Sequence, residues 1–147
     1  MSKRMIDQIG GEDALRKLVG DFYDFIETLP EANNLKRLHM RGHGIAHARV
    51  ELFNFMSGFL AGRRYFEEKH GHTNVRLVHA HVPITVQDAE SWLTCMDAAL
   101  LKNGLDGPEI DRLRETLRRI CMILVNDLGE WGMPHFSQRS QTPSSNI

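Results

Sequence analysis

Apolar residues recur at three- and four-residue steps over most of this chain, which is the period of amphipathic α-helices. The first stripe follows the Gly10-Gly11 pair, stops at Pro30 and consists of Leu15, Leu18, Phe22, Ile26 and Leu29. A second stripe predicts a helix over about residues 44–61, and its members are Ala48, Leu52, Phe55, Met56 and Phe59. We find no alternation of apolar and polar positions long enough to predict a strand.

Two further helices are predicted in the second half of the chain. Thr85 and Asp88 follow Pro83 in the pattern of a capping box, so a third helix begins at about Thr85. Pro108 suits the first turn of a fourth helix, whose apolar stripe continues to Leu128. The chain is therefore predicted to be all-α, with long irregular segments at about 30–44 and 62–84. Irregular segments of that length in a small domain usually serve a function.

The composition is that of one ordinary globular domain. The chain has 147 residues, 41% of them hydrophobic, and a net charge of −1. Its 18 basic and 19 acidic residues are interspersed, and the arginines between 112 and 119 lie on the polar side of the last helix, so nucleic-acid binding is not expected. We predict a folded domain over residues 1–128 and a polar, disordered tail over residues 129–147.

The N-terminal segment has no apolar signal core, and no run of about 18 apolar residues occurs. A cytoplasmic protein without a membrane partner is therefore expected. Cys95 and Cys121 have apolar helical neighbours, which predicts reduced thiols in or near the core. A disulfide or redox pair is the alternative interpretation.

The segment from Val75 to Met96, VRLVHAHVPITVQDAESWLTCM, carries the candidate chemistry. His79 lies in a short apolar run ahead of Pro83, and Trp92 lies two turns inside the helix that follows. A neutral imidazole is a good axial ligand for haem iron, and an indole can line an apolar pocket while offering one N–H donor. This spacing alone is a weak signal, so its surroundings decide the interpretation.

Three more segments, FYDFIETLPE, LFNFMSGFLAGRRYFEEKHGH and WLTCMDAAL, resemble in this order the truncated haemoglobins, and within them group II. The resemblance runs from about Ile6 to Leu128 and is densest from Leu52 to Leu100. It implies a truncated globin fold, in which two antiparallel helix pairs form a two-over-two sandwich around haem b. It also implies that the segment before the proximal histidine wraps the haem edge.

The resemblance assigns His79, thirteen residues before Trp92, as the proximal iron ligand, with His81 as the competing histidine. On the distal side it places Tyr23, His39 and Trp92 as polar groups. The alternatives are a core phenol for Tyr23 and a solvated loop histidine for His39. Ala48 and Leu52 match the two positions that face the iron from the second helix, so the usual distal histidine is absent.

The residues that the resemblance places on the porphyrin are Leu52, Phe55, Met56, Phe59, Trp92 and Met96, although such a stripe is also typical of plain core. Arg76 matches a propionate-binding arginine, and Lys69 and His72 are weaker candidates. The chain departs from the family pattern in three places. Val78 replaces the usual arginine, Ala61-Gly62-Arg63 replaces a glycine pair and proline, and the segment near His43 is slightly longer.

The implied function is reversible binding of O2, with NO and CO as further ligands, by a monomer or homodimer. The alternative is a haem enzyme, an NO dioxygenase or peroxidase, that needs an external reductase. A haem-free helical module that binds Zn²⁺ through its histidines is a third interpretation. For resting iron we expect an open or water-bound sixth position, with His39, His43 or the Tyr23 phenolate as internal alternatives and His47 pointing away.

Overall fold

A computed structural model gives the structure of residues 4–79 and 82–126, and every element within these residues is a helix. The four long predicted helices are present as α2 (Glu12–Thr28), α4 (Ile45–Phe59), α7 (Val86–Lys102) and α8 (Pro108–Leu124). The shorter elements are α1 (Met5–Ile9), the 3₁₀ turn η1 (Pro30–Ala32), α3 (Asn33–Arg41), α5 (Tyr65–His70) and α6 (Val75–Val78). The all-α prediction is confirmed.

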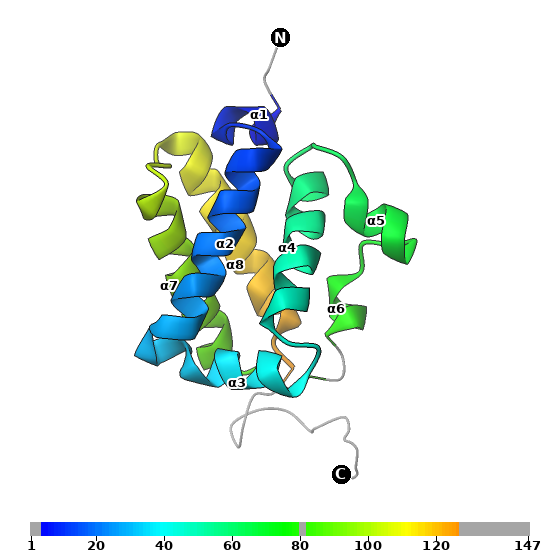
Figure 1. The fold of residues 1–147 in the computed structure, drawn as a ribbon, viewed down its shortest axis with the longest axis vertical. Coiled ribbons are helices and arrows are strands. Elements are labelled where there is room, and N and C mark those ends of the chain that lie inside the picture. Colours follow the sequence, from blue (N-terminus) through cyan, green and yellow to red (C-terminus); the bar gives the residue numbers. More distant parts are fainter. Residues whose placement is uncertain (1–3, 80–81, 127–147) are drawn as a thin grey trace.

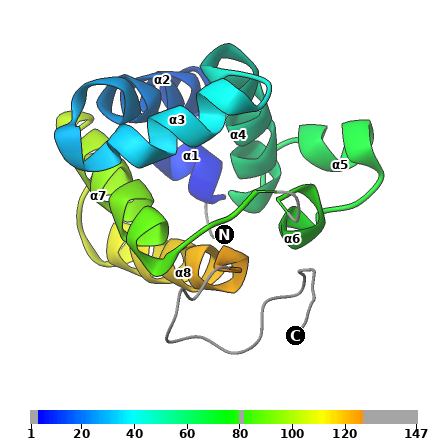
Figure 2. The same ribbon diagram turned by 90° about the horizontal axis from the view of Figure 1, so that it is seen from below.

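The long helices form two antiparallel pairs (Figure 1). The α2/α4 pair lies above the α7/α8 pair in the end-on view of Figure 2, and α2 packs directly on α7. The stripe of α2 lies in the core between the layers, because Leu15, Leu18, Phe22 and Ile26 are all fully buried. Helices α5 and α6 lie beside α4, away from α7. In the part of the chain that the structure describes, no helix is long and apolar enough to cross a membrane.

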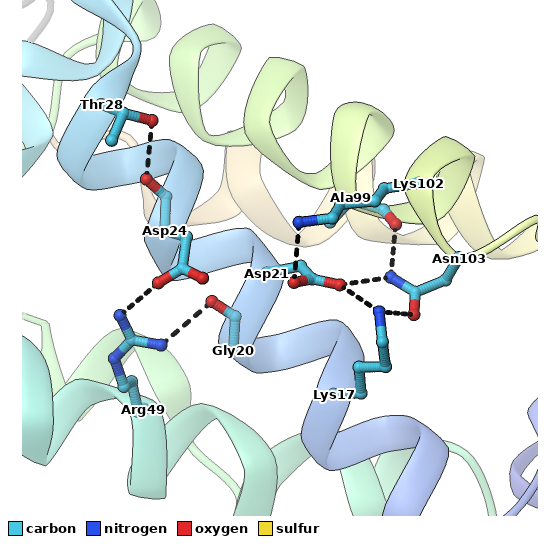
Figure 3. A network of polar contacts seen from close by, with 9 residues as sticks. All are labelled: Lys17, Gly20, Asp21, Asp24, Thr28, Arg49, Ala99, Lys102 and Asn103. Atoms are coloured by element: carbon cyan, nitrogen blue, oxygen red, sulfur yellow. Dashed lines mark hydrogen bonds and ion pairs between the residues drawn. The ribbon is translucent and has the colours of Figure 1, made fainter.

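A buried carboxylate ties α2 to the C-terminal end of α7 (Figure 3). Asp21 accepts hydrogen bonds from Lys17 Nζ at 2.9 Å and from Asn103 Nδ2 at 3.0 Å, and it pairs with Lys102 at 3.3 Å. The hydrogen bond from Lys17, together with those from Asn103 and Lys102, lowers the pKa of Asp21, although burial opposes this shift. The carboxylate is therefore charged at neutral pH and holds two layers of the sandwich together.

Arg49 joins α4 to α2 on the opposite side of α2 (Figure 3). Its Nη1 donates to the carbonyl oxygen of Gly20 at 3.0 Å, and its Nη2 donates to Asp24 at 2.9 Å and to Glu27 at 3.0 Å. Arg49 directly follows Ala48, one of the two predicted iron-facing positions. These contacts therefore fix the separation of α2 and α4 beside the candidate site.

The capping box that begins the third predicted helix is confirmed. Thr85 Oγ1 accepts from the Asp88 backbone N–H, and the Asp88 carboxylate accepts from the Thr85 backbone N–H, both at 3.0 Å. Both cysteines are buried free thiols, as predicted. Burial raises the pKa of Cys95 to about 11 and that of Cys121 to about 12, so neither is a reactive thiolate at neutral pH.

The two predicted irregular segments are wrong, because η1 and α3 occupy most of 30–44 while α5 and α6 lie within 62–84. These helices are too short to show a long stripe, and α3 buries Leu35 alone. The last helix was predicted to reach Leu128 but ends at Leu124, since Val125 is extended and Asn126 bonds to Ile84. Leu128 and the predicted tail 129–147 lie outside the described residues.

Candidate functional site

His79 directly follows α6 and is half-buried. Its Nδ1 lies 2.6 Å from the carbonyl oxygen of Val75, one turn earlier. A carbonyl oxygen can only accept, so Nδ1 carries the proton and Nε2 keeps its lone pair. An imidazole held in this way presents Nε2 as a metal ligand with its ring orientation fixed.

Tyr23 belongs to an aromatic cluster formed by residues of α2, α3 and α7. The ring centroid of Phe22 is 4.8 Å from that of Tyr23 and also 4.8 Å from that of Trp92. Tyr23 is 4% exposed, and burial raises the pKa of its phenol although the positive charge of Arg49 opposes this. The phenol is therefore a protonated donor at neutral pH, which disfavours the Tyr23 phenolate as a resting ligand.

Neither the Tyr23 hydroxyl nor the Trp92 indole N–H has a hydrogen-bond partner among the described residues. Neither donor is among the buried side-chain atoms that lack a partner in the described residues, which are Glu51 Oε2 and Ser57 Oγ, so both donors can be reached by a ligand or by water. The Phe22 ring contacts both the Tyr23 ring and the Trp92 ring. Both donors therefore belong to residues of one aromatic cluster.

His39 lies in the last turn of α3 and not in a loop, which corrects its predicted setting. Its Nδ1 lies 2.8 Å from the Leu35 carbonyl oxygen, and its ring meets that of Tyr23 edge-on at 5.6 Å. Burial lowers the pKa of His39, the bond to Leu35 opposes this, and the nearby His79 lowers it further. A neutral His39 with its proton on Nδ1 offers Nε2 as an acceptor, so it is a polar neighbour of Tyr23 but not a free donor.

The predicted porphyrin contacts separate into two groups. Ala48, Leu52, Phe55, Phe59 and Trp92 are half-buried and pack against the edge of the core. Met56 and Met96 are fully buried, with 0% and 1% of their surface exposed. The first group leaves apolar surface that a flat apolar ligand could cover, whereas the two methionines lie in the core behind it.

A cavity of about 250 Å³ lies between α4 and α5. The stacked rings of Phe55 and Phe59, with centroids 5.8 Å apart, form its apolar wall together with Phe66. Arg64 and Thr73 contribute polar groups to its lining. Two of the predicted porphyrin contacts therefore border an open volume and not a closed core.

The predicted propionate ligands have different surroundings. Arg76 is exposed and forms no ion pair with a described residue. Lys69 is already paired with Glu51 at 3.3 Å, and Glu51 also accepts from His70 at 2.9 Å. His72 Nδ1 accepts from the Asn74 backbone N–H at 3.0 Å, which leaves Nε2–H as a donor. Arg76 is thus the least committed of the three predicted candidates.

The remaining histidines do not form a metal site in the described ranges 4–79 and 82–126. His43 and His47 contact each other, with ring centroids 4.8 Å apart, and His47 lies 3.7 Å from Glu51. No group of three or more His, Cys, Asp or Glu side chains within those ranges is arranged to hold an ion. His81 and the side chain of Val78 lie outside the described part of the chain.

Two residues of the site were not assigned from the sequence. Phe22 was predicted as core and is buried, and its ring also contacts both Tyr23 and Trp92. The guanidinium of Arg49 lies 5.8 Å from the centroid of the Tyr23 ring. The sequence carries no signal for this contact, because it depends on which faces of α2 and α4 meet.

Comparisons with known proteins agree with this architecture. The bacterial-like globin family matches residues 4–126. The group 2 truncated hemoglobin YjbI of Bacillus subtilis (strain 168) is 32% identical over 116 residues, which cover 79% of this chain and 84% of the relative. The group II truncated hemoglobin from Bacillus anthracis superposes with a TM-score of 0.79 at 26% identity, covering 90% of this chain and 98% of that one. A cold-adapted truncated hemoglobin from the Antarctic bacterium Pseudoalteromonas haloplanktis TAC125 gives 0.78 at 27% identity, covering 85% and 99%.

Proposed function

The chain belongs to the bacterial-like globin family, within its group II truncated haemoglobins, and on this premise we propose that it holds haem b through His79 and reversibly binds O2. NO and CO are further ligands of the same site. The observation that carries the proposal is the imidazole of His79, whose Nδ1–H is bound to Val75 while Nε2 is left to coordinate.

The residues present fit this group in three respects. His79 supplies the nitrogen donor that iron requires. Half-buried apolar side chains on α4 and α7, with Leu52, Phe55 and Trp92 among them, offer surface that a porphyrin would cover. Arg76, exposed and three residues before His79, supplies a positive charge suited to a propionate.

A haem bound here would supply an iron with one position open to a diatomic gas. The surrounding side chains would then bind the gas and keep water away from it. Tyr23 and Trp92 donate hydrogen bonds to the gas, because both donors lack a partner in the described residues. His39 keeps a neutral ring packed edge-on against the Tyr23 phenol, which holds the phenol ring in place. Leu52 and Phe55 exclude water.

Two donors favour slow release of O2 over rapid delivery. A hydrogen bond to a group with developing negative charge contributes about 1.5–3 kcal/mol, which corresponds to roughly a ten- to two-hundred-fold slower release. Retention of this kind suits storage, sensing or chemistry on the bound gas. An NO dioxygenase or peroxidase role would need an external reductase.

Rapid-mixing displacement of O2 by CO tests the proposal on the haem-reconstituted protein. Slow O2 release that accelerates when either donor is removed would support it. Failure to bind O2 at all, or release that does not respond to the loss of both donors, would overturn the distal assignment. Adding NO with a reductase separates the two activities: one stoichiometric oxidation supports a binding protein, and continuous turnover supports the enzyme.

A further inference from the structure

The short segment after α8 returns to the chain that carries His79. Asn126, two residues beyond the end of α8, makes three hydrogen bonds to residues 82 and 84. Its backbone N–H donates to the Ile84 carbonyl at 3.0 Å, its Oδ1 accepts from the Ile84 N–H at 2.7 Å, and its Nδ2 donates to the Val82 carbonyl at 2.8 Å. The Asn126 amide thus binds this main chain as a neighbouring strand would.

The segment that Asn126 holds connects His79 to α7. The Val82 N–H donates to the His79 carbonyl oxygen at 3.0 Å, so Val82 is hydrogen-bonded both to Asn126 and to His79. Thr85, which follows Ile84, begins the capping box of α7. Figure 2 shows the described part of this segment, from residue 82 onward, leading into α7. Its position is therefore fixed from α7 on one side and from Asn126 on the other.

We propose that Asn126 is the positioning residue for the proximal ligand, an inference that rests on the proposed role of His79. Val75 fixes the rotation of the imidazole ring, and Asn126 fixes the main chain that follows it. Together they determine how Nε2 is aimed at the iron. Without the second constraint, His79 has more freedom to tilt, since α6 is a single turn of four residues.

Asparagine is suited to this position because its amide offers one acceptor and one donor side by side. Alanine would remove both side-chain bonds and keep the backbone bond to Ile84. Aspartate would keep the acceptor for the Ile84 N–H but would place a carboxylate oxygen against the Val82 carbonyl. Aspartate should therefore perturb the segment at least as much as alanine, although it differs from asparagine in few atoms.

The test compares Asn126→Ala and Asn126→Asp with Asn33→Ala, which removes an exposed asparagine whose side chain bonds to no described residue. The main readout is the iron–histidine stretching band of the ferrous protein in resonance Raman spectra, together with the rate of haem transfer to an acceptor globin. Both Asn126 variants should shift or broaden the band and speed haem loss, by up to about thirty-fold for two ordinary hydrogen bonds. Asn33→Ala should change neither.

A second measurement on the haem-free protein separates the inference from the proposed function. Amide exchange at Ile84 should become faster in Asn126→Ala, because its acceptor is lost. If the wild-type protein binds haem and neither Asn126 variant alters the stretching band, the positioning role is wrong while the function stands. If the wild type takes up no haem, the proposed function is wrong. If amide exchange at Ile84 is the same in Asn126→Ala as in the wild type, the hydrogen bond from the Ile84 N–H to Asn126 is also absent, and the positioning role is wrong.

Discussion

Replacing Tyr23 with phenylalanine removes one oxygen atom from a side chain that is 4% exposed. The ring packing against Phe22 and the edge-on contact with His39 can both remain, because a phenylalanine ring has the same shape. The variant therefore isolates the hydroxyl group. We predict that this change weakens gas retention and leaves protein stability nearly unchanged.

The magnitudes follow from the surroundings of the hydroxyl. It has no hydrogen-bond partner in the described residues, so its bond to a bound gas meets no competing acceptor there. Losing a bond of about 1.5–3 kcal/mol should speed O2 release by roughly ten- to two-hundred-fold. In the haem-free protein the hydroxyl bonds to no described residue and is not among the buried unpaired atoms, so its removal should leave the free energy of unfolding nearly unchanged.

Tyr65→Phe is the matched control, because the Tyr65 hydroxyl has partners in the structure. It donates to the Glu12 carboxylate, whose two oxygens lie 3.0 and 2.9 Å away. This substitution should lower the stability of the protein and leave O2 release unchanged. Rapid mixing of the O2 complex with CO gives the release rate, and denaturant unfolding of the haem-free proteins gives the stability.

Unchanged O2 release in Tyr23→Phe would refute the donor role of Tyr23. A marked loss of stability in the same variant would also contradict the reasoning, since it would show that the hydroxyl already has a partner within the protein. Equal acceleration in Tyr65→Phe would mean that the effect is general and not a property of the site.

Three further predictions follow from other parts of the structure. Trp92→Phe should speed O2 release by about ten-fold in the same rapid-mixing assay, and an unchanged rate would remove the indole from the site. Asp21→Asn should lower stability at neutral pH by roughly 1–3 kcal/mol. Because its partners, Lys17 above all, lower the pKa of Asp21, this stability is present above about pH 4 and is lost as the pH falls through the folded-state pKa. Denaturant unfolding at several pH values should show the difference narrowing in acid, and a constant difference would contradict it. Ala61→Gly should raise the melting temperature, since Ala61 has φ of 69° and glycine relieves about 1 kcal/mol of left-handed strain there; a lower melting temperature would contradict this.

The long helices could be predicted from the sequence because each buries a stripe that repeats over 15 to 17 residues. The start of α7 was also predictable, since the bonds between Thr85 and Asp88 are local. His79, Tyr23 and Trp92 depended on the family resemblance. Periodicity alone placed Tyr23 at the edge of a stripe, and the structure buries it.

Contacts between distant segments could not be predicted in the same way. The apolar stripe of the last helix continues to Leu128 in the sequence, yet the chain leaves α8 at Val125 so that Asn126 can bond to Ile84. Arg49 likewise pairs with α2 residues 22 to 29 positions earlier. Such bonds depend on where the helices meet, which no local pattern encodes.

The protonation state of His39 also could not be predicted from the sequence. The family resemblance predicts His39 as a distal polar group, but the location of its proton depends on the Leu35 carbonyl and on burial in the folded chain. We therefore propose Tyr23 and Trp92 as the two donors and exclude His39 from that role.

The central claim is that His79 holds the iron, and a hemin titration followed by visible absorption tests it most directly. Haem-free wild-type protein, His79→Ala and His81→Ala are titrated in parallel, and the Soret band is recorded at each addition. We predict that wild type and His81→Ala saturate at a single equivalent with the same spectrum, while His79→Ala binds weakly or gives the spectrum of a haem without its histidine. Normal binding by His79→Ala together with loss of binding by His81→Ala, or no Soret band in the wild type, would contradict it.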